Sequence, residues 1–344
     1  MLYTRSTSTH RIQALLGLCL FGLLLSGCSG TAAPAVSALA PAQARVQLSW
    51  LHTIEWAGFY AAEEHGYYKD QALTVDLLVG GEDAQGNYID PIQVVLDGRA
   101  DFGVVGGGHL IKARANGAPL VAIASSYQRH PLAFTSLAEK QIATPQDLIG
   151  KTVQIAPDSR MLLDAMLTAT GVDASQVKIE DRTDFSIAPL LNGDADVIDS
   201  FITNEAVSLK LAGHDFNALM PVDYGVEEYP NVIFTSEQMI AAHPDVVERF
   251  LRGTFQGIEK AIADPQQVAP LAVRRDPSLD LAKETEALFQ SVPLLKPSGS
   301  QPGMMTAKTW QASYQILHDQ GVLKQPVDVQ SVYTLAFLDK IYTK

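Results

Sequence analysis

Short apolar strands alternate with amphipathic helices along this chain, and this alternation limits the possible folds more than any other feature. The first series runs from residue 46 to residue 125. It predicts strands at 46–51, 73–79, 100–105 and 120–125, and helices at 57–66, 89–97 and 110–116. Strands that alternate with helices build an open, mainly parallel sheet with helices on both faces, so we expect an α/β fold.

The alternation starts again at Pro145, where Thr144 is a suitable N-cap and proline suits the first helical position. The second series predicts strands at 153–156, 177–180 and 197–202, and helices at 161–169, 187–191 and 205–212. A last strand is predicted at 232–234, and from residue 243 onward the pattern predicts helices at 243–262, 265–274, 281–291, 307–320 and 329–342. We therefore expect two lobes joined by two chain crossings that act as a hinge, with lobe 1 at 46–135 plus 233–344 and lobe 2 at 136–232. Ligands favour the cleft at the carboxyl ends of such strands.

The amino terminus carries an export signal. Arg5 and Arg11 precede an apolar run at 15–25, and Leu-Ser-Gly-Cys at 25–28 matches a lipobox. The run is shorter than the about 20 residues that a membrane-spanning helix needs. We expect a lipoprotein signal peptide at 1–27, a lipid on Cys28, and a flexible tether at 28–45 that is rich in small residues and proline. An ordinary signal peptide or a plain membrane anchor is the alternative.

This signal predicts a protein held at the cell membrane by lipid and facing the extracytoplasmic side. Only Cys19 and Cys28 are present, and Cys19 would leave with the signal, so we expect neither a disulfide nor a thiolate metal site. The eight histidines show no metal-ligand spacing, and we expect His109, His130 and His214 to be surface or cleft-rim residues. The net charge of −13 argues against nucleic acid as a partner.

Several segments carry a family resemblance. Trp50, Ala-Gly-Phe-Tyr at 57–60, Gly-Tyr-Tyr-Lys at 66–69 and Leu-Thr-Val at 73–75 follow one another in one stretch. Further matches lie at 97–104, 113–117, 147–153, 194–197 and 204–205. Over about residues 46–260 the chain resembles the NMT1/THI5-like family of solute-binding proteins of ABC importers. The resemblance implies a type II periplasmic-binding-protein fold, a transport role, permease and ATPase partners, and a monomer that captures a vitamin-like small molecule.

The resemblance leaves the ligand open. Asn204 and Glu205 match the position where receptors for thiamine precursors place a glutamate on an aminopyrimidine edge. Those receptors carry a stretch rich in asparagine and histidine where this chain reads His-Thr-Ile-Glu-Trp at 52–56. This aromatic version is more similar to the riboflavin receptors of the family. We expect riboflavin first, with formylaminopyrimidine or hydroxymethylpyrimidine, a sulfonate or another small solute as alternatives.

Two other classes of function stay open beside transport. Enzymes that make the thiamine pyrimidine resemble this family, but they carry a cysteine-rich iron-binding motif that this chain lacks, and Gly-x-Ser-x-Gly is absent too. We therefore expect no catalytic residue and no cofactor. A membrane-tethered sensor domain would have the same sequence features, and a neighbouring permease gene would distinguish a transporter from it.

The candidate ligand-binding residues come from loops that should border the cleft. We expect Trp56 to stack on a flat heterocycle, Glu205 to accept N–H bonds, and the amides of Gly107 and Gly108 to line the cleft. The further candidates are Trp50, His52, Glu55, Tyr127, Asp158, Ser159, Asn204 and Tyr224. Each has a purely structural alternative, which is core packing for Trp56, a tight turn for the glycines, helix capping for Asn204 and hinge packing for Tyr224.

Overall fold

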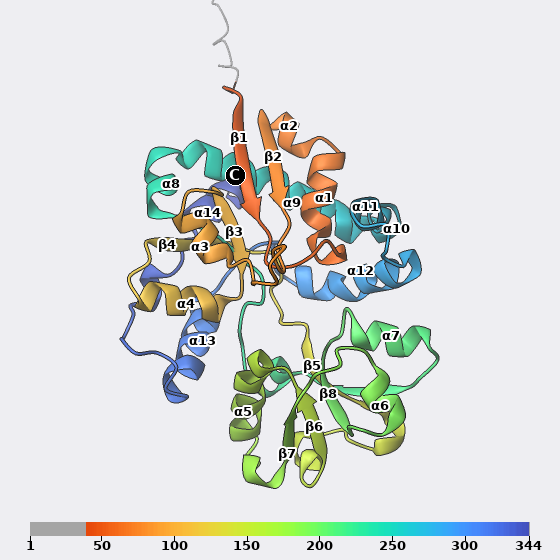
Figure 1. The fold of residues 1–344 in the computed structure, drawn as a ribbon. Coiled ribbons are helices and arrows are strands. Elements are labelled where there is room, and N and C mark those ends of the chain that lie inside the picture. Colours follow the sequence, from red (N-terminus) through yellow and green to blue (C-terminus); the bar gives the residue numbers. More distant parts are fainter. Residues whose placement is uncertain (1–38, 344) are drawn as a thin grey trace, which may run out of the picture. The chain divides into compact units, whose positions relative to one another are not determined.

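The structure is a computed structural model that describes residues 39–343. The predicted signal peptide, Cys28 and most of the predicted tether lie outside these residues. The described chain contains two five-stranded sheets, each flanked by helices (Figure 1). We call the first sheet with its helices lobe 1 and the second sheet with its helices lobe 2. Within residues 39–343 no helix is both long and apolar enough to cross a membrane.

Lobe 1 is built on a sheet with the strand order β2-β1-β3-β10-β4. β1 pairs in parallel with β2 and with β3, whereas β10 runs antiparallel to β3 and β4. The strands are β1 Ala42–Gln47, β2 Leu73–Leu78, β3 Phe102–Val105, β4 Leu120–Ser125 and β10 Val232–Ser236. β3 and β4 consist wholly of buried residues because helices cover both faces of the sheet.

Lobe 2 repeats this arrangement with the strand order β7-β6-β8-β5-β9. β6 pairs in parallel with β7 and β8, and β5 runs antiparallel to β8 and β9. The strands are β5 Leu132–Leu137, β6 Thr152–Ile155, β7 Lys178–Asp181, β8 Val197–Phe201 and β9 Phe216–Leu219. In each sheet one strand, β10 or β5, runs antiparallel to its neighbours and lies next to a chain crossing. The sequence predicted the two mainly parallel sheets and the two crossings, but not the antiparallel direction of these strands.

Eleven described α-helices belong to lobe 1 and three belong to lobe 2. Those of lobe 1 are α1 Ala57–Glu64, α2 Tyr67–Asp70, α3 Pro91–Leu96, α4 Gly107–Ala115, α8 Glu237–Ala242, α9 Pro244–Ala263, α10 Pro265–Val268, α11 Pro270–Arg275, α12 Leu281–Leu295, α13 Ala307–Asp319 and α14 Ala336–Tyr342. Those of lobe 2 are α5 Arg160–Ala169, α6 Ala188–Asn192 and α7 Glu205–Leu211. The short 3-10 turns are η1 Ile54–Trp56, η2 Ala138–Lys140, η3 Pro145–Leu148, η4 Pro157–Ser159, η5 Ala174–Gln176, η6 Pro221–Tyr224 and η7 Val329–Ser331.

The largest core lies in lobe 1, where α9 packs along α1 and the sheet. Close packing of these two helices depends on Gly257, because a Cβ there would lie 2.0 Å from the carbonyl oxygen of Gly58. Trp56 and Trp310 are fully buried in this core. Lobe 2 has a separate, smaller core between its sheet and α5.

Several predicted boundaries need correction. β1 begins at Ala42, so the last four residues of the predicted tether at 28–45 are a strand that pairs with β2. The predicted lobe boundary at 135/136 falls inside β5, which belongs to the sheet of lobe 2. The two crossings therefore lie at 126–131 and 220–231, where an ion pair of 2.6 Å joins Arg129 to Asp223. The sequence pattern missed β5, which follows β4 with no helix between them, and β9, which follows α7 but pairs only with the antiparallel strand β5.

The helical tail also differs in detail from the prediction. The helix predicted after Pro265 ends at Val268 and resumes at Pro270, because proline cannot donate the backbone hydrogen bond of a helix interior. The last predicted helix divides into η7 and α14. Thr144 is the N-cap as expected and forms a capping box with Asp147, but the element that follows is the 3-10 turn η3.

Candidate functional site

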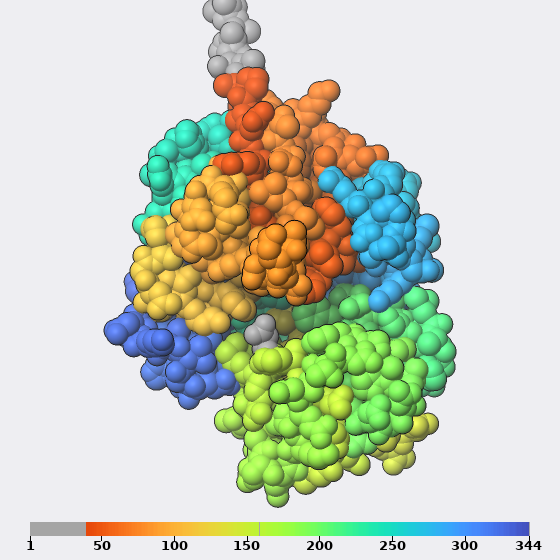
Figure 2. Space-filling view, viewed as in Figure 1, coloured from red at the N-terminus to blue at the C-terminus, as the bar shows by residue number. Residues whose placement is uncertain are grey.

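A cleft of about 1300 Å³ lies between the two lobes. Figure 2 shows the surface hollowed between the upper part of the described molecule and the green lobe 2 below it. Both lobes and both crossings contribute to the lining, which includes the carboxyl ends of β3 and β8 and the amino ends of α4, α5 and α7. This is the position that parallel strands provide for ligand binding.

Aromatic side chains with large exposed surfaces line both walls of the cleft. Trp50 is 49% exposed and Tyr88 is 54% exposed on the lobe 1 side, and Phe185 is 60% exposed and Phe201 is 36% exposed on the lobe 2 side. Tyr127, on the first crossing, also lines the cleft but is buried, and its hydroxyl donates to Ser291 Oγ at 3.0 Å. Exposed aromatic faces on two opposed walls suit a flat ring that both lobes contact.

Two carboxyl groups on the lobe 1 wall already hold donors of the chain. Glu55 Oε1 accepts from the side-chain amide of Asn231 at 2.7 Å, and Glu284 Oε2 accepts from the backbone N–H of Ile54 at 2.7 Å. Burial raises the pKa of both carboxyl groups above the ordinary value, although each hydrogen bond acts in the opposite direction.

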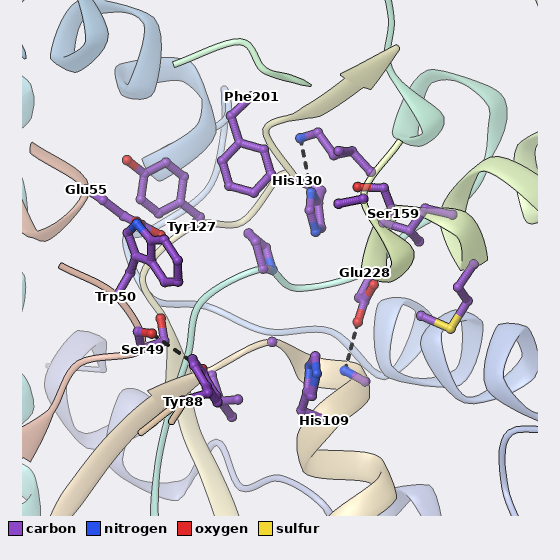
Figure 3. Close-up of a pocket in the computed structure, with 18 of the residues that line it drawn as sticks. Ser49, Trp50, Glu55, Tyr88, His109, Tyr127, His130, Ser159, Phe201 and Glu228 are labelled. Atoms are coloured by element: carbon purple, nitrogen blue, oxygen red, sulfur yellow. Dashed lines mark hydrogen bonds between the residues drawn. The ribbon is translucent and has the colours of Figure 1, made fainter. Parts of the chain in front are cut away.

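The amino end of α4 forms a third part of the lobe 1 wall. The N–H of Gly107 donates to the carbonyl oxygen of Tyr229 at 2.8 Å, and the N–H of Gly108 donates to Glu228 Oε1 at 2.8 Å. Figure 3 shows this second bond as a dashed line beside His109. Both acceptors lie on the second crossing, so the second crossing covers the amino end of α4.

The lobe 2 wall is organised around Arg182, whose side chain is 2% exposed. Its guanidinium donates to Asp199 Oδ1 at 2.9 Å and to the carbonyl oxygen of Asp199, and it also donates to the carbonyl oxygens of Asp184 at 2.8 Å and Ser186 at 3.0 Å. The second oxygen of Asp199 accepts from Ser159 Oγ and from the backbone N–H of Ala156. The charge of Asp199 is therefore compensated by a cation and two further donors.

Glu205 borders the same cluster with weaker compensation. Its Oε2 accepts from the backbone N–H of Phe201 at 2.9 Å, whereas its Oε1 lies 3.7 Å from Arg182 Nη2. Burial is the largest effect and raises the pKa of the carboxyl group, and the nearby Arg182 only partly offsets it. A buried carboxyl group at the start of α7 can accept N–H bonds, or donate when protonated, at the edge of a bound ring.

His130 lies on the first crossing and lines the cleft. Its Nδ1 accepts from the backbone N–H of Leu132 at 3.1 Å, and its ring meets Phe201 edge to face with 6.0 Å between ring centroids. Burial lowers the pKa of the imidazole to about 4, so the ring is neutral at pH 7 and carries its proton on Nε2. Within residues 39–343 no group of three or more histidine, cysteine, aspartate or glutamate side chains could hold a metal ion.

Seven of the twelve predicted residues line the cleft. They are Trp50, Glu55, Gly108, Tyr127, Ser159, Asn204 and Glu205. The amide of Gly108 is taken by Glu228, so it is not an open donor. Asn204 is exposed, and its side chain makes no capping bond to α7.

Four predicted residues lie away from the cleft lining. Trp56 packs in the lobe 1 core with its Nε1 donating to the carbonyl oxygen of Leu51 at 2.9 Å, because η1 turns Ile54 and Trp56 inward and leaves Glu55 facing the cleft. His52 Nδ1 bonds the hydroxyl of Tyr60 at 2.9 Å. Gly107 is covered by Tyr229, and Tyr224 packs on the lobe 2 core.

Asp158 lies in η4, and its side chain is outside the described part of the structure.

Several lining residues were missed by the sequence reasoning. They are Tyr88, Arg182, Phe185, Asp199, Phe201, Glu228 and Glu284. Asp199 and Phe201 had a usable signal, because they lie at the carboxyl end of the predicted strand 197–202. Of the other five, Glu284 lies on the distant helix α12. The remaining four lie in loops, namely Tyr88, Arg182, Phe185 and Glu228.

The comparisons with known proteins agree with this architecture. A family model described as "NMT1/THI5 like" matches residues 53–268. A formylaminopyrimidine-binding protein of Halalkalibacterium halodurans is 30% identical over 330 residues, which cover 93% of this chain and 97% of that protein. The riboflavin-binding protein RibY of Chloroflexus aurantiacus is 26% identical over 336 residues, with 92% and 95% covered.

Two further matches place an enzyme and a solved structure beside these relatives. A 4-amino-5-hydroxymethyl-2-methylpyrimidine phosphate synthase of Legionella pneumophila is 22% identical over 300 residues, with 85% and 90% covered. The periplasmic aliphatic sulphonate binding protein SsuA of Escherichia coli superposes with a TM-score of 0.68 at 15% identity, over 85% of this chain and 92% of that one. This last likeness confirms the periplasmic-binding-protein fold. With the family model matched over most of the two lobes, and with a relative at 30% identity over almost the whole length, this chain belongs to the NMT1/THI5-like family.

Proposed function

We propose that this protein is the extracytoplasmic solute-binding lipoprotein of an ABC importer and that it captures a flat, uncharged nitrogen heterocycle. The observation that carries the proposal is the cleft itself, which has exposed aromatic faces on both walls and buried carboxyl groups around them. Closing the lobes on a flat ring would remove both ring faces from water, while the carboxyl groups would accept N–H groups at the ring edge.

Riboflavin is the first ligand we propose. Four aromatic side chains, Trp50 and Tyr88 on one wall and Phe185 and Phe201 on the other, offer more stacking surface than a single pyrimidine ring would cover. The similarity to a riboflavin-binding relative supports the same ligand.

A formylaminopyrimidine-type ligand is the second candidate, and a specific observation favours it. Glu205 is a cleft-lining carboxyl group whose pKa is raised by burial. A protonated carboxyl group both donates and accepts, which matches the ring nitrogen and the adjacent amino group of an aminopyrimidine. The relative at 30% identity carries the name of such a receptor.

Calorimetric titration of a chain that begins at residue 39 decides between the two ligands. If riboflavin is the ligand, it binds saturably, and in a parallel fluorescence titration it quenches the emission of Trp50. Phe201→Ala should then reduce the binding free energy of riboflavin by about 1 kcal/mol or more. Phe289→Ala is the matched control, because Phe289 is a similarly exposed phenylalanine on α12 that does not line the cleft. If formylaminopyrimidine binds instead, Glu205→Ala should weaken its binding at least as strongly, because alanine can neither donate to the ring nor accept from it. Binding of neither compound would refute the proposed ligand class.

The membrane anchor is proposed on the amino-terminal motif alone. Lipid on Cys28 would hold the receptor beside its permease and ATPase. Metabolic labelling with a fatty acid should mark the full chain and not a Cys28→Ala variant. Labelling of both, or of neither, would refute lipidation at Cys28.

We propose a binding role and not catalysis. Incubation of the protein with the bound heterocycle should return the heterocycle chemically unchanged.

A further inference from the structure

The amino end of α4 points into the cleft, and its first turn is a natural place for an anion. α4 has nine residues, and Gly106, Gly108, His109 and Lys112 all line the cleft. The free N–H groups and the dipole of a helix start attract negative charge. A phosphate or sulfonate group of a ligand would therefore be expected here if the position were open.

The position is occupied by the chain's own carboxyl group. Gly108 N–H donates to Glu228 Oε1 at 2.8 Å, and Gly107 N–H is taken by the carbonyl oxygen of Tyr229. Glu228 is 9% exposed, and its approach depends on glycine at position 108, because a Cβ there would lie 2.6 Å from Glu228 Oε1. Burial raises the pKa of Glu228, whereas the Gly108 N–H and the charge of Lys112 lower it.

Several other donors at the cleft are held in the same way. The N–H of Ile54 meets Glu284, the amide of Asn231 meets Glu55, and the N–H of Phe201 meets Glu205. On the lobe 2 wall, Arg182 and the N–H of Ala156 meet Asp199. An anionic ligand that enters this cleft meets carboxyl groups in front of these donors, and unfavourable pairing of this kind is how a site rejects a competitor.

We propose that Glu228 is a specificity-determining residue that fills the anion position at the start of α4, so that the receptor takes the uncharged heterocycle and rejects its phosphate ester and other anionic solutes. This inference rests on the proposed function only for the identity of the heterocycle. Glu228 is the deciding group among the cleft carboxyls, because its removal would open two suitable anion partners together, the Gly108 N–H and Lys112.

The test uses two variants and a matched control. Glu228→Gln removes the charge and keeps an acceptor for Gly108, and Glu228→Ala empties the position. Glu227→Gln is the control, because it changes the net charge equally one residue away, where Glu227 pairs with Lys308 and Thr309 and does not line the cleft. Riboflavin, riboflavin 5′-phosphate and inorganic phosphate are titrated at pH 8, which favours the ionised form of a carboxyl group.

We expect the affinity for riboflavin 5′-phosphate, taken relative to the affinity for riboflavin in the same variant, to rise about tenfold or more in Glu228→Gln and in Glu228→Ala. Inorganic phosphate should raise the melting temperature of Glu228→Ala by roughly 2 °C or more and leave the native protein and Glu227→Gln unchanged. This phosphate readout needs no heterocycle, so it tests Glu228 even if riboflavin fails to bind. The proposal is overturned if neither variant gains phosphate binding, or if the native protein binds the phosphate ester as tightly as riboflavin.

Discussion

Replacing Arg182 with methionine should destabilise lobe 2 severely. The side chains of Arg182, Asp199 and Glu205 are 2%, 7% and 11% exposed, so the substitution leaves two buried carboxyl groups without their cation. Removing one partner of a buried ion pair costs about 3–5 kcal/mol because the remaining charge stays desolvated. The carbonyl oxygens of Asp184 and Ser186 lose a charged donor as well, which moves the expected loss toward the upper end of that range.

Urea denaturation of the ligand-free protein measures this loss. Arg160→Met is the matched control, because Arg160 is a half-exposed arginine of the same lobe that pairs with Asp164 one helical turn away. An exposed pair of this kind contributes about 0.3–0.5 kcal/mol, so the control should differ from the native protein by less than about 1 kcal/mol. The loss in Arg182→Met should shrink as the pH falls, because burial raises the pKa of Glu205 and its protonation removes an unpaired buried charge. Equal losses in the two variants would show that the Arg182 cluster is not a buried ion pair.

Three further results are expected. Gly257→Ala should cost about 1–3 kcal/mol of unfolding free energy, since its Cβ would lie 2.0 Å from the Gly58 carbonyl oxygen, and an unchanged denaturation midpoint would contradict the close α1–α9 packing. Burial raises the pKa of Glu55, so its contribution to stability is present at low pH and is lost as the pH rises through the folded pKa. Glu55→Gln should therefore gain stability relative to the native protein between about pH 4 and pH 8, and a constant difference would refute the shift. Acrylamide should quench one tryptophan, and Trp50→Phe should remove that fraction, because Trp56 and Trp310 are fully buried.

Local sequence patterns predicted most of the fold for an identifiable reason. The parallel strands and their helices alternate in period and are bounded by glycine, proline and capping residues, so β4 was predicted at its observed bounds and α5 and α7 within one residue. The strands β5 and β9 were not predicted, because neither pairs in parallel with a strand of the strand–helix alternation. Pairing partners far apart in the sequence leave no periodic signal.

The site divides along the same line. Sequence alone determined that residues at 50–56, 106–108 and 204–205 follow strand ends and so border a cleft. Only the tertiary structure decided which side chains of those loops face it, and it turned Trp56 into the core beside a cleft-facing Glu55. The bond between Glu228 and Gly108 spans 120 residues, and the pairing of Arg182 with Asp199 joins the loop after β7 to β8, which is two strands away in the sheet. In such loops no helical or strand period fixes the direction of a side chain, and its direction depends on which distant neighbour buries or bonds it.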